Sequence, residues 1–331
     1  MGSTMKAIRY DAYGPPDVLE LRDVDMPAVG DDEVLVRVRA ASVNPLDWHF
    51  MRGTPYLVRM LAGPLRPRAS VGRLGADMAG SVEAVGKNVT KFRPGDEVFG
   101  GLEDRGTFAE YISIREDAVV LTKPAGLTFE QAASVPVAAF TALQALRDKG
   151  RIQPGHKVLV NGASGGVGTF AVQIAKAFGA GVTGVCSTAN VEMVASIGAG
   201  QVVDYTREDF TQAGRRYDLL VDIAGNRTLS KTRRVLVPKG VLVAVGGPDK
   251  GRWIGPLGRS ARMALLSPAV SQRMVSFLAH QSQGDLAVLR ELLQTGKVTP
   301  VIDRTYPLSE VAEAIRYLEK GHARGKVVIT V

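Results

Sequence analysis

The segment that most constrains the fold is "KVLVNGASGGVGTFAVQIAKA", residues 157–177 of the 331-residue chain. Its apolar start predicts a buried strand that ends at Val160, and the residues from about 167 onward predict a helix with one apolar face. Between strand and helix lie Ala163, Ser164, Gly165, Gly166, Val167 and Gly168. This turn has the pattern G-x-G-x-x-G with alanine in the first place, which between a strand and a helix is typical of a dinucleotide site.

The parts of this turn have separate physical roles in binding a dinucleotide. We expect Gly165 to let the backbone approach a pyrophosphate, and Gly168 to let the helix pack closely on the strand. The start of the helix offers unpaired N–H groups and a partial positive charge to the phosphates. The alternative interpretation is a tight turn with a purely structural role.

The following strand, "GVTGVCS", bears on the choice of dinucleotide. An acid at its end, some 20 residues past the glycines, would bind the adenosine 2′-hydroxyl of NAD. Here the strand ends in Ser187 and Thr188, whose hydroxyls can donate to a 2′-phosphate, so the sequence favours NADP(H). No basic residue follows directly, although Arg207 could substitute; alternatively, the two residues only begin a loop and the choice is loose. We expect Tyr205 to lie against the adenine or phosphate, or else to end a surface strand.

The pattern of predicted secondary structure changes at about residue 124. Before it, short β-rich runs such as "DEVLVRVRAASV" and "GTFAEYISI" alternate with Gly, Pro and Asp turns, which predicts a barrel-like domain. From 125 to 282, apolar strands alternate with helices, which is typical of a doubly wound parallel sheet. We expect the tail, 283–331, to fold back and complete the domain formed by 1–124.

Composition excludes several classes of protein. The chain is 45% hydrophobic, but no apolar run approaches the roughly 20 residues of a membrane span. The first ten residues lack an apolar signal segment, and Cys186 is the only cysteine, which excludes intrachain disulfides and cysteine-rich zinc sites. We therefore expect a cytoplasmic protein. The net charge of +8 suits anionic small molecules, whereas no basic run is dense enough to indicate a nucleic-acid-binding tail.

Motifs spread over nearly the whole chain resemble one enzyme superfamily. They are "SVNPLDW", "GADMAGSVEAVG", "RPGDEVFG", "GTFAEY", "ASVPVAAFTALQAL", "NGASGGVG" and "ARGKVVITV". Together they resemble the medium-chain dehydrogenase/reductases, specifically the zinc-independent quinone oxidoreductase branch. The resemblance implies an α/β fold in which a Rossmann domain interrupts a GroES-like β-barrel domain. It also implies a homodimer, for which "VSFLAHQ" is the candidate interface strand.

The resemblance also indicates where zinc-dependent relatives hold their catalytic metal. The corresponding positions are Asn44, Ala76 and Val137, none of which ligates zinc in the usual way. The acid beside the middle position is retained as Asp77, and the four-cysteine zinc lobe is missing. The four histidines, His49, His156, His280 and His322, show no ligand spacing. We therefore expect no metal site.

The expected lack of zinc restricts the chemistry. Zinc would stabilise a developing alkoxide, so hydride transfer to a plain ketone lacks its strongest electrophile. An enone or a quinone gives a delocalised anion, which a few hydrogen-bond donors can stabilise. The sequence therefore favours NADPH-dependent reduction of a small-molecule quinone or enone. Two alternatives stay open. The first is a zinc-free alcohol or aldehyde oxidoreductase. The second is a nucleotide-bound protein without turnover that contacts RNA through its basic surface, although the sequence contains no RNA-binding motif.

Candidate catalytic groups come from the loop "NPLDWHFMRGTPY". By resemblance, Asn44 lies near the nicotinamide ribose and substrate, Tyr56 lies at the substrate cleft, and His49 is placed for proton transfer. Their alternative roles are a turn residue, loop packing and a surface histidine, and water could also return the proton. The resemblance adds cofactor contacts from Thr141, Val245, Gly246 and Lys326. The basic segment 57–75 is predicted as a long loop that shapes the substrate entrance or is simply solvated.

Overall fold

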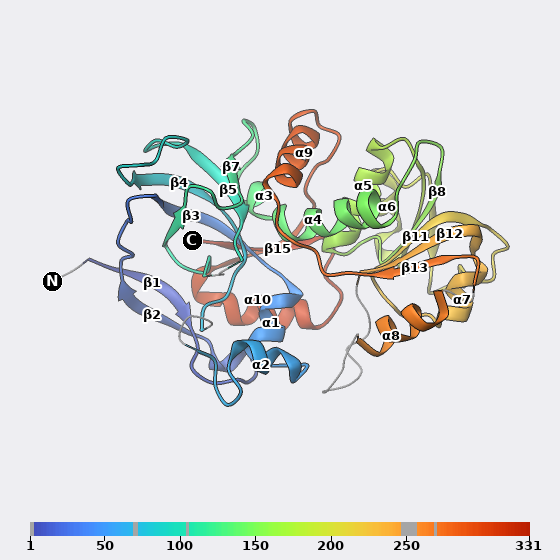
Figure 1. Cartoon of the computed structure of the whole chain (residues 1–331), viewed down its shortest axis with the longest axis horizontal. Helices are drawn as coiled ribbons and strands as arrows, with labels where there is room; N and C mark the ends of the chain where they lie inside the picture. The colour runs from blue at the N-terminus through green and yellow to red at the C-terminus, as the bar shows by residue number, and fades with distance from the viewer. Residues whose placement is uncertain (1–2, 69–71, 104–105, 246–256, 268–269) are drawn as a thin grey trace. The chain divides into compact units, whose positions relative to one another are not determined.

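The computed structural model describes residues 3–68, 72–103, 106–245, 257–267 and 270–331, and Figure 1 draws the others in grey. No helix within these ranges is long and apolar enough to cross a membrane.

The chain folds as two compact units. The first, called here the β unit, comprises Met1–Val137, Gln281–Gln294 and Ile302–Val331, and the second, the Rossmann unit, comprises Ala138–His280 and Thr295–Val301. The β unit extends past residue 124 because helix α3 (Phe129–Ala133) packs on its sheet.

The short segment 295–301 belongs to the Rossmann unit for a clear reason. The Gln173 side chain donates to the Thr299 carbonyl at 3.0 Å and accepts from the Thr299 N–H at 2.8 Å. These two bonds tie the segment to helix α5 (Gly166–Ala177), which carries Gln173.

The β unit is built on a mostly antiparallel sheet. Strands β1 (Thr4–Arg9) and β2 (Glu20–Asp25) form a separate pair. The main sheet consists of β3 (Glu33–Val43), β4 (Asp77–Val85), β5 (Glu97–Gly101), β6 (Tyr111–Arg115), β7 (Val120–Thr122), β14 (Ile302–Pro307) and β15 (Lys326–Thr330). Its order is β14-β15-β3-β4-β5-β7, with β6 on β3. The C-terminal tail thus supplies two strands to the sheet that the N-terminal residues begin.

Helices close the β unit. They are α1 (Pro45–Arg52), α2 (Leu57–Ala62), α3, α9 (Gln283–Gln294) and α10 (Val311–Glu319), with 3-10 turns at Pro16–Val18 and Leu308–Glu310. The segment predicted as a loop at 57–75 therefore begins with a helix, and 69–71 lie outside the described residues. That helix is held by Arg59, whose guanidinium lies 4.7 Å from the ring of Tyr13 and whose Nε donates to the Gly53 carbonyl at 3.0 Å.

The Rossmann unit contains a six-stranded parallel sheet. Its strands are β8 (Lys157–Asn161), β9 (Gly181–Cys186), β10 (Gln201–Asp204), β11 (Tyr217–Asp222), β12 (Leu236–Ala244) and β13 (Arg273–Ser276). Their order, β10-β9-β8-β11-β12-β13, reverses direction at β8, and in such sheets ligands bind beyond the carboxyl ends of the strands at this reversal. The predicted α/β class with a doubly wound parallel sheet is confirmed.

Helices alternate with most of the parallel strands. Helix α4 (Pro136–Gln144), which continues as a π-helix over Ala145–Lys149, precedes β8. The others follow β8, β9, β11 and β12: they are α5, the 3-10 turn Thr188–Asn190 with α6 (Val191–Ser196), α7 (Leu229–Arg234) and α8 (Leu257–Leu266). The central strand β8 is buried along its apolar run, with Val158, Leu159 and Val160 fully inaccessible. A strand covered on both faces requires such a continuous apolar run.

Candidate active site

The glycine turn joins β8 to α5 as its pattern predicted. Gly165 caps the helix in extended conformation, and Gly166 and Val167 open its first turn. A Cβ placed on Gly168 would lie 2.0 Å from the Gly162 carbonyl oxygen, so only glycine fits there. A Cβ on Gly165 would meet nothing closer than 3.7 Å, so the fold does not require glycine at this position. The open space above Gly165 fits a phosphate that approaches the backbone at the start of the helix.

A side chain that the sequence analysis missed connects this turn to the end of β9. The amide of Asn190 donates to the hydroxyl of Ser164 and to that of Ser187, each at 3.2 Å. Among the described residues, its buried Oδ1 has no hydrogen-bond partner. Asn190 thus holds together two hydroxyls that were both predicted to bind the cofactor. Because both hydroxyls accept from the amide, each keeps its own proton for an acceptor such as a phosphate.

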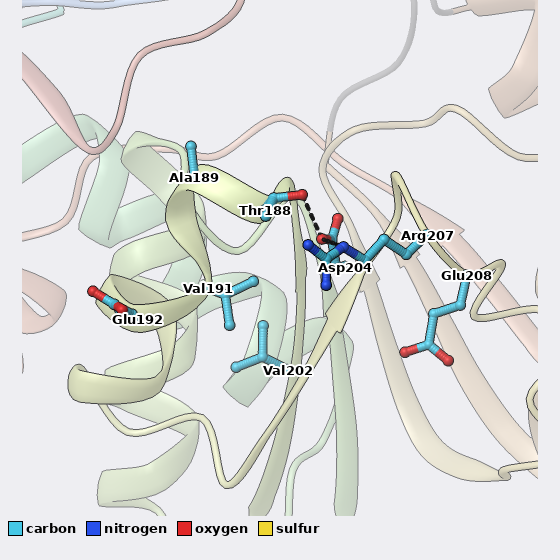
Figure 2. A pocket seen from close by; sticks show the side chains of 8 residues that line it. All are labelled: Thr188, Ala189, Val191, Glu192, Val202, Asp204, Arg207 and Glu208. Carbon is cyan, nitrogen blue, oxygen red and sulfur yellow. Dashed lines mark hydrogen bonds and ion pairs between the residues drawn. The ribbon is translucent and has the colours of Figure 1, made fainter.

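Beyond β9, a cavity of about 550 Å³ lies between the turn and helix that follow β9 and strand β10 with the turn after it (Figure 2). It is lined by Thr188, Ala189, Val191, Glu192, Val202, Asp204, Arg207 and Glu208. Tyr205, predicted to contact adenine, follows β10 with its side chain 42% exposed, and its N–H donates to the Cys186 carbonyl at 3.0 Å. The Cys186 side chain itself is buried, and burial raises the pKa of its thiol to about 11.

Of the remaining predicted cofactor residues of this unit, Ala163 belongs to the turn, whereas Thr141 and Val245 lie apart from it in sequence. Thr141 is a half-buried residue of α4. Ala163 is fully buried under the turn, where its N–H donates to the Val185 carbonyl at 3.0 Å. Val245 follows β12 and donates its N–H to the Asp222 carbonyl at 3.0 Å, whereas Gly246 lies outside the described residues.

In the β unit, strand register brings together three polar residues that are far apart in the sequence. Ser42, near the end of β3, pairs with Asp77 at the start of β4 and with Val328 of β15. Asn44 follows β3 directly and Lys326 begins β15, so their side chains meet Asp77 at one edge of the sheet, where β3 ends and β4 and β15 begin. The side chains of Asn44, Asp77 and Lys326 are at least 96% buried.

These residues form a hydrogen-bonded network around a buried charge pair. The Lys326 ammonium donates to Asn44 Oδ1 at 2.6 Å and lies 3.4 Å from Asp77 Oδ2. Asp77 Oδ2 also accepts from Ser42 Oγ at 2.6 Å and from Asn44 Nδ2 at 2.9 Å. Desolvation lowers the pKa of Lys326, and the nearby Asp77 charge partly opposes that shift.

This network changes the interpretation of Asn44. Its amide N–H groups donate to Asp77 and to the Ser42 carbonyl, and its oxygen accepts from Lys326. Asn44 is thus bonded within the β unit at both ends of its amide. Lys326 uses two of its three N–H groups in the contacts above, which makes it the better candidate in this network for donating to a ligand.

A second buried acid supports the same corner. Asp47, in the first turn of α1, accepts from the N–H groups of Asn44 at 2.7 Å and Gly75 at 2.9 Å. Burial raises its pKa to about 6, although these bonds oppose the shift. Asp47 thereby fixes the backbone on which Asn44 sits.

The predicted residues His49 and Tyr56 belong to one continuous segment, in which His49 lies within α1 and Tyr56 directly precedes α2. His49 Nδ1 donates to the Thr54 carbonyl at 2.7 Å, because a carbonyl only accepts, and the ring stacks on Trp48 at 3.7 Å. Tyr56 is half-buried at the start of α2, with the Arg59 guanidinium 4.9 Å from its ring. Both rings are therefore held by neighbours of the same segment.

The residues at the metal positions of zinc-dependent enzymes do not fit a metal ion. Asn44 Oδ1 is occupied by the Lys326 ammonium, a cation that repels another, and Ala76 and Val137 carry no ligating atom. Within the ranges that the structure describes, no group of three or more His, Cys, Asp and Glu side chains is arranged to hold a metal.

Comparisons with known proteins agree with this geometry. Residues 30–124 match the family "Alcohol dehydrogenase GroES-like domain", and residues 197–329 match "Zinc-binding dehydrogenase". The mitochondrial NAD(P)H oxidoreductase RTN4IP1 of Mus musculus is 36% identical over 99% of this chain and 90% of its own length. The 2-methylene-furan-3-one reductase of Solanum lycopersicum is 35% identical over 99% of this chain and 79% of its own length.

Among solved structures, the quinone oxidoreductase from Coxiella burnetii superposes with a TM-score of 0.86 at 32% identity, covering 99% of this chain and 100% of that one. The family resemblance and the oxidoreductase class that the motifs predicted are therefore confirmed. The chain belongs to the medium-chain dehydrogenase/reductase superfamily, in its quinone oxidoreductase-like branch, and is an NAD(P)H-dependent oxidoreductase.

Proposed function

We propose that this protein reduces quinones and α,β-unsaturated carbonyl compounds with NADPH, without a catalytic metal. The observation that carries the proposal is the Asn44–Asp77–Lys326 network, in which a buried ammonium donates to Asn44, a position that the resemblance aligns with a zinc ligand. The names of the tomato and Coxiella relatives, an enone reductase and a quinone oxidoreductase, support the same substrate class.

The chemistry follows from the groups that are present. The bound cofactor supplies a hydride, and the substrate must carry the resulting negative charge until a proton arrives. An enone or quinone spreads that charge over several atoms, so hydrogen-bond donors can stabilise it where an isolated alkoxide would need a metal.

The chain offers three groups for the roles of donor and proton source. Tyr56 is the proposed donor to the substrate oxygen, and Arg59 holds its ring in place. His49 is the proposed proton relay, since an imidazole can take up and release a proton near neutral pH and its Nδ1–H is fixed on the Thr54 carbonyl. We propose that Asn44 contributes by orienting Lys326 toward cofactor and substrate.

Proposed cofactor contacts are assigned to each unit separately. In the Rossmann unit, Gly165, Ser164 and the start of α5 would hold the pyrophosphate, with Thr141 and Val245 beside the nicotinamide. Ser187 would donate to the 2′-phosphate, which favours NADPH over NADH. In the β unit, Lys326 would donate to the ribose or a phosphate.

Assembly and location are further proposals. The edge strand β13 is followed by Leu278, which is 95% exposed, so we propose a homodimer paired through this edge; light scattering coupled to gel filtration measures the mass. We keep a cytoplasmic location as the proposal from composition, to be checked by fractionation.

A panel of acceptors tests the proposed function. We expect NADPH oxidation, followed by absorbance, to be faster with quinones and enones than with isolated ketones and aldehydes. Faster turnover of simple aldehydes or ketones would indicate a zinc-free alcohol dehydrogenase. Cofactor binding with no turnover of any acceptor would indicate a nucleotide-bound binding protein.

A further inference from the structure

We propose that Asp204 is a specificity-determining residue for the adenosine end of the cofactor, where it favours a 2′-hydroxyl and opposes a 2′-phosphate. The inference rests on the proposed function, because it assumes that NAD(P)H binds along the glycine turn. It predicts that NADPH is preferred only weakly over NADH, although the strand before Ser187 carries no acid.

The sheet itself brings this carboxylate to the cofactor end of β9. In the parallel pairing of β9 with β10, Asp204 lies opposite Cys186, the residue before Ser187. Its Oδ2 accepts from the Thr188 hydroxyl at 2.5 Å (Figure 2). An acid that the usual dinucleotide pattern places on the second strand is therefore supplied by the third.

The hydroxyl groups around this cavity differ in whether they already donate a hydrogen bond. Thr188 gives its proton to Asp204 Oδ2, and Thr206 gives its own to Asp204 Oδ1 at 2.7 Å. Ser187 accepts from Asn190 and keeps its proton. A ribose 2′-hydroxyl can accept from Ser187 and donate to the carboxylate, whereas a 2′-phosphate, which has mainly acceptor oxygens, finds a donor among these hydroxyls only at Ser187.

The charges around the cavity also disfavour a 2′-phosphate. Three carboxylates line it, Asp204, Glu192 and Glu208, against a single guanidinium from Arg207. Arg207 Nε lies 3.4 Å from Asp204 Oδ2, and its side chain is 76% exposed. The Thr188 hydrogen bond lowers the pKa of Asp204, so the carboxylate is ionised at neutral pH. A bound 2′-phosphate must therefore share Arg207 with Asp204.

The test compares Asp204→Asn with Glu208→Gln, a control that removes a charge from the same cavity without touching Thr188. Asparagine keeps an acceptor oxygen for the Thr206 N–H, 3.0 Å away, so the local turn is retained and the melting temperature should stay near that of wild type. Dissociation constants for NADPH and NADH are measured by fluorescence titration. We expect Asp204→Asn to raise the ratio Kd(NADH)/Kd(NADPH) on the order of tenfold, and the control to change it less than about threefold.

A second variant, Arg207→Ala, keeps the proposal falsifiable if Asp204→Asn is unstable. We expect it to weaken NADPH binding severalfold and to leave NADH binding nearly unchanged. An unchanged ratio in Asp204→Asn, an equal rise in the control, or an equal effect of Arg207→Ala on both cofactors would overturn the inference alone. Failure of the wild-type chain to bind either cofactor would overturn the proposed function, and this inference with it.

Discussion

Replacing Asp77 by leucine tests the buried charge network most directly. Its carboxylate accepts from Ser42 Oγ, Asn44 Nδ2, Lys326 Nζ and, through Oδ1 at 2.9 Å, the Val137 N–H. The substitution leaves the Lys326 ammonium buried without its acid. Breaking a buried pair in this way typically costs about 3–5 kcal/mol of the free energy of unfolding.

The partner substitution, Lys326→Met, should cost less. Asp77 then keeps three of its four donors, which go on stabilising its charge. We expect a loss of about 1–3 kcal/mol, in the range of a lost hydrogen bond to a charged group. The double variant removes both charges, so its cost should fall below the sum of the two single costs by roughly 1–3 kcal/mol.

Urea unfolding in a Trp253→Phe background measures these costs, because Trp48 is then the only tryptophan and reports on the β unit. The exposed pair Lys6–Asp23, with Nζ and Oδ2 2.7 Å apart, serves as the control, and Lys6→Met should cost less than about 1 kcal/mol. Single costs of Asp77→Leu and Lys326→Met that add to within about 0.5 kcal/mol would refute the coupled network.

Three further predictions follow from local geometry. Gly165→Ala should have the melting temperature of wild type but bind NADPH at least tenfold more weakly. Gly168→Ala should instead lower the melting temperature, because its Cβ would meet the Gly162 carbonyl. Calorimetry measures the effect on stability, and titration measures the effect on NADPH binding. Asp47 has its pKa raised from 3.8 to about 6 in the folded state, so its contribution to the free energy of unfolding falls as pH rises from about 4 to 6; Asp47→Asn should flatten that dependence, and an identical slope would contradict the assignment. Cys186 should stay inert to a thiol-specific chromophoric reagent at pH 8 until the protein unfolds, and rapid labelling of the folded chain would disprove its burial.

Local patterns predicted the parts of the site that depend on adjacent residues. The glycine turn was found because its strand, turn and helix occur in one continuous segment. Helix α2 was predicted as a loop because its segment is rich in Pro and Gly. Its conformation depends on Arg59 packing against Tyr13, more than forty residues earlier in the chain.

The contacts that the sequence did not predict depend on strand register or on the path of a turn. Lys326 was predicted to contact the cofactor, but its bond to Asn44 joins residues 282 positions apart and becomes visible only when β15 pairs with β3. Asp204 was not predicted because the dinucleotide pattern concerns an acid at the end of the second strand, whereas Asp204 lies at the end of the third. Asn190 carries no motif, and its role follows from the turn that folds it over Ser164.

The carbon that receives the hydride distinguishes reduction of a conjugated double bond from reduction of a carbonyl group. The chelator-dialysed protein is incubated with NADPH carrying deuterium at nicotinamide C4 and with a simple enone, and the product is analysed by NMR. Our account predicts a saturated ketone with deuterium on the β-carbon, because the charge left by hydride addition there is delocalised onto the carbonyl oxygen. Deuterium on the carbonyl carbon of an allylic alcohol would contradict it.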